Sequence, residues 1–336
     1  MLSPGIEWEI LNQEAIDLYR AGYCDRAMVV AKTAIEVVER NVGPDHLAVG
    51  TSLNILALLY DTQGQYVQAE PLYERSLAIA VKVLGPDHPD VAASLNNLAG
   101  HYYTRGQYAQ AETLLKRSLA ISENALGPDH PDVATSLNIL AELFRSEGQY
   151  AFAEPLYKRS LAIRENTLGP DHPDLATSLN NLALPYATNG RYAQAEPFYE
   201  RSLVIIENVL GPDHPDVAKG LNNLALLCDH QSRYAEAEPL YKRSLAIYEN
   251  ALGPDHPDVA QSLNNLAFLY NTQGRYAQAE SLYERSLAIR ENALGPDHPD
   301  VAASLENLAA LYHGMERTKE AEALAHRAER IRAIQR

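Results

Sequence analysis

The apolar positions of this chain recur with the spacing of amphipathic helices. Within residues 85–126, the positions of one stripe follow the helical spacing i, i+4, i+7, i+8 and i+11: Val91, Leu95, Leu98, Ala99 and Tyr102. A turn at 105–107 (RGQ) separates this stripe from a second one of similar length, which starts at Tyr108. The pattern predicts two helices joined by a short turn.

The same pattern returns every 42 residues. The sequence GPDH begins at 43, 85, 127, 169, 211, 253 and 295, and residues 1–42 form a more divergent copy. Because two helices cannot bury their own apolar faces, stacked neighbours must bury them. We therefore expect an all-α, right-handed solenoid (superhelix) whose first helices line one concave surface. The expected single domain, 1–336, consists of eight helix-turn-helix units: 1–42 (N-terminal cap), 43–84, 85–126, 127–168, 169–210, 211–252, 253–294 and 295–336 (C-terminal cap).

The linker LGPDHPD carries signals for the end of one helix and the start of the next. Gly85 suits a left-handed residue after the last helical turn, and Pro86 cannot continue the helix. Asp87 is the expected N-cap of the following helix, with Asp90 three residues further on in the capping-box position. The linker therefore predicts a sharp reversal between units.

Charge and cysteine content narrow the possible partners and the compartment. The formal net charge is −16, and such an acidic chain repels phosphate backbones and anionic lipid, although the acidity can also serve solubility alone. Cys24 and Cys228 belong to no CxxC or metal-binding pattern. The start MLSPGIEWEI lacks a basic segment, and no apolar run reaches the roughly 18 residues of a membrane span. We expect a cytoplasmic protein that binds neither nucleic acid nor membranes.

The unit resembles the tetratricopeptide repeat of the kinesin light chain-like type, most closely its bacterial stand-alone arrays. The small and aromatic positions of that repeat are present in the second unit as Leu53, Leu56, Ala57, Tyr60, Gly64, Tyr66, Ala69 and Tyr73. The 42-residue length and the segments SLNNLA (94–99), YVQAEPLYERSLAI (66–79) and LGPDHPDVA (84–92) are similar to the light-chain variety. No heptad region precedes the repeats, so a role in joining a motor to cargo is not implied.

Two columns of asparagine run through the predicted first helices, although asparagine is a poor helix former. The first column is Asn12, Asn54, Asn96, Asn138, Asn180, Asn222 and Asn264, and the second is Asn97, Asn181, Asn223, Asn265 and Asn307. An amide can pair with the C=O and the N–H of a peptide together. The resemblance implies that asparagines at these positions hold the main chain of a bound peptide. Alternatively, the amides bond to each other or to helix ends and fix the stacking register, and both roles can coexist.

The expected peptide site combines amides with apolar contacts. The residues next to the asparagines on the expected groove are Leu58, Gly100, Glu142, Leu184, Leu226 and Phe268, and basic residues are too few there to hold an acidic ligand. We expect an apolar-anchored peptide bound by these residues: Asn54, Asn96, Asn97, Asn138, Asn180, Asn181, Asn222, Asn223, Asn264, Asn265, Leu184, Leu226 and Phe268.

No catalytic or cofactor motif accompanies this site. The repeated Asp-His pairs, such as Asp87 and His88, occur once per unit. Equivalent residues of packed helices lie roughly 8–10 Å apart, which is too far for two pairs to bind one zinc ion. We therefore expect these pairs to cap helices and form turns. The repeated Glu70 and Arg75 indicate surface or interhelical ion pairs. We expect no enzyme, no cofactor and no metal, but a protein-binding scaffold that is a monomer or associates weakly. The alternatives are a structural or self-assembly module that uses its convex face or ends, and a near-consensus array without a ligand.

One residue interrupts the pattern inside a predicted helix. Pro185 stands where other units have Leu59, Leu143, Leu227 or Leu269. An interior proline costs about 3 kcal/mol or kinks the helix. The sequence leaves open whether this is drift or a bend that reshapes the groove beside Asn180 and Asn181.

Overall fold

The computed structural model describes residues 7–334, and the sequence predictions for residues 1–6 and 335–336 lie outside this range. Over these residues the chain forms sixteen helices and no strand, as the periodicity predicts. The helices are α1 (Glu7–Arg20), α2 (Cys24–Val42), α3 (Leu47–Thr62), α4 (Tyr66–Leu84), α5 (Pro89–Thr104), α6 (Tyr108–Leu126), α7 (Pro131–Ser146), α8 (Tyr150–Leu168), α9 (Pro173–Thr188), α10 (Tyr192–Leu210), α11 (Pro215–His230), α12 (Tyr234–Leu252), α13 (Pro257–Thr272), α14 (Tyr276–Leu294), α15 (Pro299–Gly314) and α16 (Thr318–Ile334).

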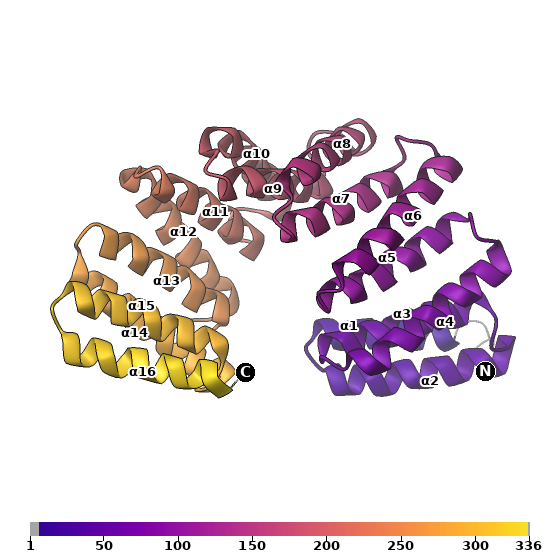
Figure 1. Ribbon diagram of the computed structural model, residues 1–336, viewed down its shortest axis with the longest axis horizontal. Coiled ribbons are helices and arrows are strands. Elements are labelled where there is room, and N and C mark those ends of the chain that lie inside the picture. Colours follow the sequence, from indigo (N-terminus) through magenta and orange to yellow (C-terminus); the bar gives the residue numbers. More distant parts are fainter. Residues whose placement is uncertain (1–6, 335–336) are drawn as a thin grey trace. The chain divides into compact units, whose positions relative to one another are not determined.

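The helices form two compact units, each of which contains several of the 42-residue repeats. The first unit ends at Gly169, and the second unit starts at Pro170. Within each unit, every odd-numbered helix packs on the even-numbered helix that follows it, and that helix packs on the next pair (Figure 1). Odd-numbered helices of neighbouring pairs also touch, as in α5 with α7 and α11 with α13. The odd-numbered helices therefore form one layer of each unit, and we call the surface that they carry the odd-helix face.

The core of each pair consists of the predicted apolar stripe. Val91, Leu95 and Ala99 of α5 have no exposed surface, and Tyr157 of α8 is 1% exposed. Fully burying one valine or leucine side chain stabilises a protein by about 1.5–3 kcal/mol. Leu98 and Tyr102 are also buried, so the whole stripe of the sequence analysis faces the interior.

A column of buried serines ties the two helices of a pair together. Ser76 of α4 donates to the main-chain oxygen of Gly50 in α3 at 3.0 Å, and Ser244 of α12 donates to that of Ala218 in α11 at 2.8 Å. The same bond joins Ser118 to Ala92, Ser160 to Ala134, Ser202 to Ala176 and Ser286 to Ala260. These serines repeat at the 42-residue spacing, so their recurrence is the sequence signal for this column.

The linker between pairs differs from the prediction in its N-cap. His88, not Asp87, is the N-cap of α5, and its Nδ1 accepts the N–H of Asp90 at 3.1 Å. The adjacent residues compete for one position, and the extended backbone at His88 (ψ 143°) aims its ring at the helix end. Gly85 has a φ of 88° as expected, but its ψ of 160° lies in a region that only glycine adopts readily rather than in the left-handed helical one.

The charged residues of the even-numbered helices form two separate sets of ion pairs. Arg75 pairs with Glu39 of the preceding repeat at 2.6 Å, and Glu70 pairs with Arg105 of the following repeat at 2.5 Å. Glu70 and Arg75, which the sequence places together, therefore do not pair with each other. Each set links neighbouring repeats.

Pro185 is buried inside α9, and the helix continues to Thr188. The main-chain oxygen of Pro185 accepts the N–H of Asn189 at 3.2 Å and its Nδ2 at 2.9 Å. The helix is therefore not broken at the proline, and whether the residue reshapes the groove stays a prediction.

Candidate functional site

Every predicted first-column asparagine from position 54 onward lies on an odd-numbered helix. Asn54, Asn96, Asn138, Asn180, Asn222 and Asn264 are half-buried, because the apolar stripe beside them takes the interior positions. In the second column Asn97 is exposed, whereas Asn181, Asn223 and Asn265 are half-buried. The two columns thus run along the border between the core and the odd-helix face.

Some of these amides bond to each other across neighbouring repeats. Nδ2 of Asn307 donates to Oδ1 of Asn264 at 2.9 Å, and Nδ2 of Asn265 donates to Oδ1 of Asn222 at 3.4 Å. These bonds are of the kind expected for amides that fix the stacking register. In this part of the second unit, the first-column oxygens are occupied by the chain itself.

Other amide oxygens have no partner. Oδ1 of Asn54, Asn96 and Asn180 is buried and accepts no hydrogen bond, although Nδ2 of Asn96 donates to Ser136 at 3.3 Å and that of Asn180 to Ser202 at 2.7 Å. Leaving a buried acceptor unpaired costs about 1–3 kcal/mol. Oδ1 of Asn12, at the equivalent position of the first repeat, is also buried and unpaired, as is its Nδ2. Native structures contain few such groups, so four at equivalent positions indicate a shared role.

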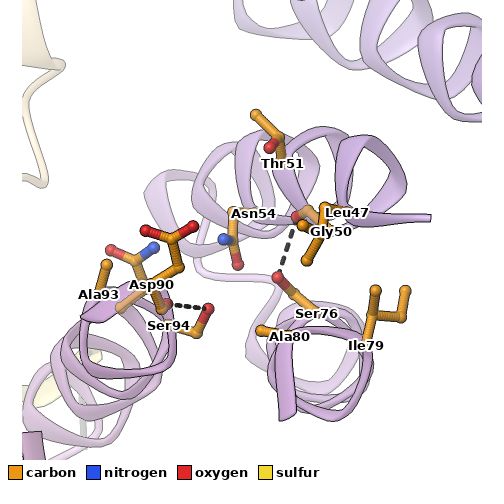
Figure 2. A pocket seen from close by; sticks show the side chains of 11 residues that line it. Leu47, Gly50, Thr51, Asn54, Ser76, Ile79, Ala80, Asp90, Ala93 and Ser94 are labelled. Carbon is orange, nitrogen blue, oxygen red and sulfur yellow. Dashed lines mark hydrogen bonds between the residues drawn. The ribbon is translucent and has the colours of Figure 1, made fainter. Parts of the chain in front are cut away.

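A cavity of about 210 Å³ lies where α3, α4 and α5 meet, beside Asn54. Figure 2 shows the Asn54 side chain pointing from α3 into this space, opposite Asp90 and Ser94, with the Ser76–Gly50 hydrogen bond beside it. Gly50 stands where later repeats carry alanine. Asn97 also lines the cavity, and no hydrogen bond joins it to Asn54.

An equivalent cavity of about 400 Å³ lies among α9, α10 and α11. It is lined by Asn180 and Asn223, which stand three repeats after Asn54 and Asn97, together with Asn181 and Leu184. Here Gly220 stands where the other aligned repeats, from 43 onward, carry serine. Cavities therefore occur at 54/97 and 180/223, whereas the equivalent asparagines at 222/265 and 264/307 are bridged.

The predicted apolar contacts lie exposed on the second unit. Leu184 on α9, Leu226 on α11 and Phe268 on α13 are 36%, 41% and 47% exposed. Large apolar side chains at one position of three odd-numbered helices give the odd-helix face of this unit an apolar row.

A buried histidine and aspartate form a feature that the sequence analysis missed. His101 of α5 is buried, and its Nδ1 lies 2.7 Å from Oδ1 of Asp61 in α3. Burial, followed by Asp61, raises the pKa of the nearby Tyr73 hydroxyl. Asp229 occupies the position of Asp61 in the second unit, where Leu269 stands at the position of His101. Burial raises the pKa of the Asp229 carboxyl, and His230 opposes that shift. The sequence signal for this pair is His101 itself, because most other repeats carry leucine at its position.

The described residues 7–334 contain no group of three or more His, Cys, Asp or Glu side chains arranged to hold a metal ion. Over the same residues, no helix combines the length and the apolar character needed to cross a bilayer. Cys24 and Cys228 are both free thiols.

The sequence profile described as "Tetratricopeptide repeat" matches seven overlapping segments of the chain: 9–80, 62–124, 90–166, 132–188, 186–250, 221–292 and 258–333. The chain belongs to the tetratricopeptide repeat family. The resemblance inferred from the sequence is thereby confirmed. Arrays of this family are typically non-catalytic scaffolds for protein–protein interaction.

Solved structures place this tetratricopeptide repeat array among kinesin light chain-like proteins. BtubC (BKLC) from P. vanneervenii is 29% identical over 69% of this chain and 91% of its own, with a TM-score of 0.57. Kinesin light chain TPR-like repeats from P. anserina are 28% identical over 62% of this chain and 98% of their own, with a TM-score of 0.51. The quorum sensor NprR from B. thuringiensis shares the fold at 16% identity, over 97% of this chain and 88% of its own, with a TM-score of 0.68. Curated proteins gave no match.

Proposed function

We propose that this tetratricopeptide array holds extended segments of partner proteins on the odd-helix faces of its units and that it does so without catalysis. Asparagine amides contact the main chain of these segments, and apolar side chains such as Leu184, Leu226 and Phe268 contact their side chains. The observation that carries the proposal is the set of unpaired amide oxygens of Asn54, Asn96 and Asn180.

The cavities support this role because they lie beside two of these amides. The Asn54 and Asn180 side chains line open space while their oxygens face the interior without a partner. Rotation about the Cβ–Cγ bond turns the oxygen toward the cavity, where a peptide N–H can pair with it.

The bridged pairs favour a second role for the later asparagines. Asn222 and Asn264 already accept hydrogen bonds from Asn265 and Asn307. These four residues serve the stacking register, as the alternative in the sequence analysis has it. Main-chain contact is then concentrated at Asn54, Asn96 and Asn180.

This division gives a test with a matched control. Peptides of twelve residues are selected from a random library on the wild-type protein, and their dissociation constants are measured for two variants. Asn54→Ala/Asn96→Ala/Asn180→Ala is expected to weaken binding at least tenfold, whereas Asn222→Ala/Asn264→Ala weakens it less than threefold. Circular dichroism melts confirm that both variants are folded. Equal affinity of the first variant and the wild type would overturn the proposal.

A further inference from the structure

His101 occupies a core position that carries an apolar residue in the neighbouring repeats. The equivalent residues are Leu59, Leu143, Leu227, Leu269 and Leu311, and at 185 proline. The His101 side chain has no exposed surface. The ring centroids of Tyr66, Tyr73 and Tyr102 lie 6.2, 5.7 and 5.6 Å from the centroid of its imidazole ring. Burying a polar ring in place of leucine costs free energy of folding unless the ring is hydrogen-bonded. Its partner Asp61 therefore stabilises His101 at this position.

Gly100, the residue before His101, leaves open space above this pair. Other repeats carry Leu58, Glu142, Leu184 or Phe268 at the position of Gly100. A Cβ atom built on Gly100 would meet nothing within 4 Å. The result is a cavity of about 440 Å³ on the odd-helix face of the first unit, with Asp61 and His101 among its lining residues.

The lining of this cavity contains one carboxyl group, that of Asp61, and its Oδ1 lies 2.7 Å from Nδ1 of His101. Its other residues are Leu58, Thr62, Tyr73, Asn96, Asn97, Gly100, His101, Tyr103 and Thr104, none of which is Lys or Arg. The Tyr73 hydroxyl lies close enough to Asp61 for that carboxyl to raise its pKa, and a carboxylate retains acceptor capacity beyond the pairing with His101. Glu70, 3.9 Å from Nε2 of His101, is already paired with Arg105 at 2.5 Å.

The polar groups and the aromatic rings of the lining select the same kind of ligand. The Asp61 carboxyl group, whose side chain is 10% exposed, and the unpaired Oδ1 of Asn96 can both accept hydrogen bonds. The rings of Tyr73 and Tyr103 add surfaces of the kind that attract cations. An anion would meet the Asp61 charge, and an apolar group would leave the carboxylate without solvent.

We propose that this cavity binds the cationic side chain, lysine ammonium or arginine guanidinium, of the bound partner segment. The inference rests on the proposed function, since Asn96 and Asn97 line the same cavity and would hold the main chain beside it. The odd-helix face of the first unit then selects a basic residue, and that of the second unit selects apolar residues.

The test uses four heptapeptides, acetyl-Ser-Ala-Ser-X-Ser-Ala-Ser-amide with X as Lys, Arg, norleucine or Glu, and also n-butylammonium chloride. Binding is followed by NMR through histidine labelled with ¹³C at Cε1, with the His101 signal assigned by its loss in His101→Leu. The Lys and Arg peptides are expected to bind at least ten times more tightly than the norleucine peptide and to shift the His101 signal. The Glu peptide is expected to bind least.

Variants of the lining test whether this cavity causes the preference for the Lys peptide over the norleucine peptide. Gly100→Leu fills the cavity with a side chain that other repeats carry, and the open space around Gly100 lets the protein fold. It is expected to abolish the Lys-over-norleucine preference, as is Asp61→Asn, whereas the matched Asp229→Asn retains it. Equal binding of Lys and norleucine peptides, or an unchanged preference in Gly100→Leu, overturns the inference.

The two proposals fail in different ways. If no heptapeptide binds, the main-chain proposal loses support, and n-butylammonium then probes the cavity alone. A His101 shift that saturates with this cation and disappears in Gly100→Leu supports the cation site by itself. No shift in the wild type overturns it.

Discussion

Asn307 donates its Nδ2 to Oδ1 of Asn264, one repeat earlier, at 2.9 Å. Asn97 and Asn54 are the equivalent pair in the first unit, but no bond joins them and both line a cavity. The two asparagine columns therefore contain both pairs that are hydrogen-bonded to each other (closed) and pairs that are not (open). We propose that this difference separates residues that hold the array together from residues that are available to a ligand.

The closed pairs should contribute more to stability than the open ones. Asn307→Ala removes the donor and leaves Oδ1 of Asn264 unpaired, so we expect the free energy of unfolding to fall by about 1–2 kcal/mol. Asn97→Ala is the matched control, and because Asn97 is exposed we expect a change within about 0.5 kcal/mol. Urea unfolding of both variants measures the difference. Equal losses would mean that the inter-asparagine bond is not the relevant contact.

Histidine caps should be replaceable by another capping residue. Nδ1 of His256 accepts the N–H of Asp258 at 3.2 Å at the start of α13. We expect His256→Ala to lower the free energy of unfolding by about 1 kcal/mol and His256→Asn to restore most of it. The exposed His326→Ala on α16 is the control. A His256→Asn variant as unstable as His256→Ala would contradict the capping role.

Replacing the buried proline of α9 should stabilise the protein. Pro185 lacks an N–H inside a helix, and the other repeats carry leucine or histidine there. We expect Pro185→Leu to raise the free energy of unfolding by about 1–3 kcal/mol, and the mirror variant Leu227→Pro to lower it by about 3 kcal/mol. Thermal and urea unfolding check both. A Pro185→Leu variant that unfolds more readily would show that the surroundings are fitted to the proline ring.

One ion-pair group should give stability that depends on pH. Hydrogen bonds from Arg275 and Lys242 lower the pKa of Glu238 from 4.5 to about 2. Because the pKa is lower in the folded state, this stabilisation is present above pH 4.5 and is lost as the pH falls toward 2. We expect Glu238→Gln to cost about 1 kcal/mol or less at pH 7, since solvent screens the pair, and only a small part of that cost at pH 2, where Glu238 is half protonated in the folded state.

Urea unfolding of the wild type and Glu238→Gln between pH 2 and pH 7 measures how the difference between their free energies of unfolding shrinks as the pH falls. Glu322→Gln, an exposed glutamate of α16, is the control and is expected to follow the wild type at each pH. A cost of Glu238→Gln that stays constant down to pH 2 would rule out the ion pair as its cause.

The helices of this protein could be predicted because their signals are local. The stripe from Val91 to Tyr102 and the turn at Gly106 depend on residues within one unit. The N-cap could not be decided between Asp87 and His88, because adjacent residues differ only in the backbone angles that the linker adopts. Likewise, the partners of Glu70 and Arg75 lie in different neighbouring repeats, which no pattern within one helix specifies.

The candidate site could be predicted only as columns of residues. The sequence places Asn54 and Asn222 in the same column, yet Asn222 is bridged and Asn54 is not, because the distance between amides depends on how two repeats stack. The cavity above His101 required a glycine, a histidine and an aspartate from two repeats to be seen together. Each residue was visible in the sequence, but their contact was not.

The central claim is that Asn54, Asn96 and Asn180 recognise main chain rather than side chains. The most direct measurement combines backbone N-methylation of a selected peptide with the Asn54→Ala/Asn96→Ala/Asn180→Ala variant in a double-mutant cycle. We predict that methylating the contacted N–H groups weakens binding to the wild type at least tenfold and changes binding to the variant little. Equal loss in the wild type and the variant would contradict the claim, because the methyl groups would then act elsewhere than at these asparagines.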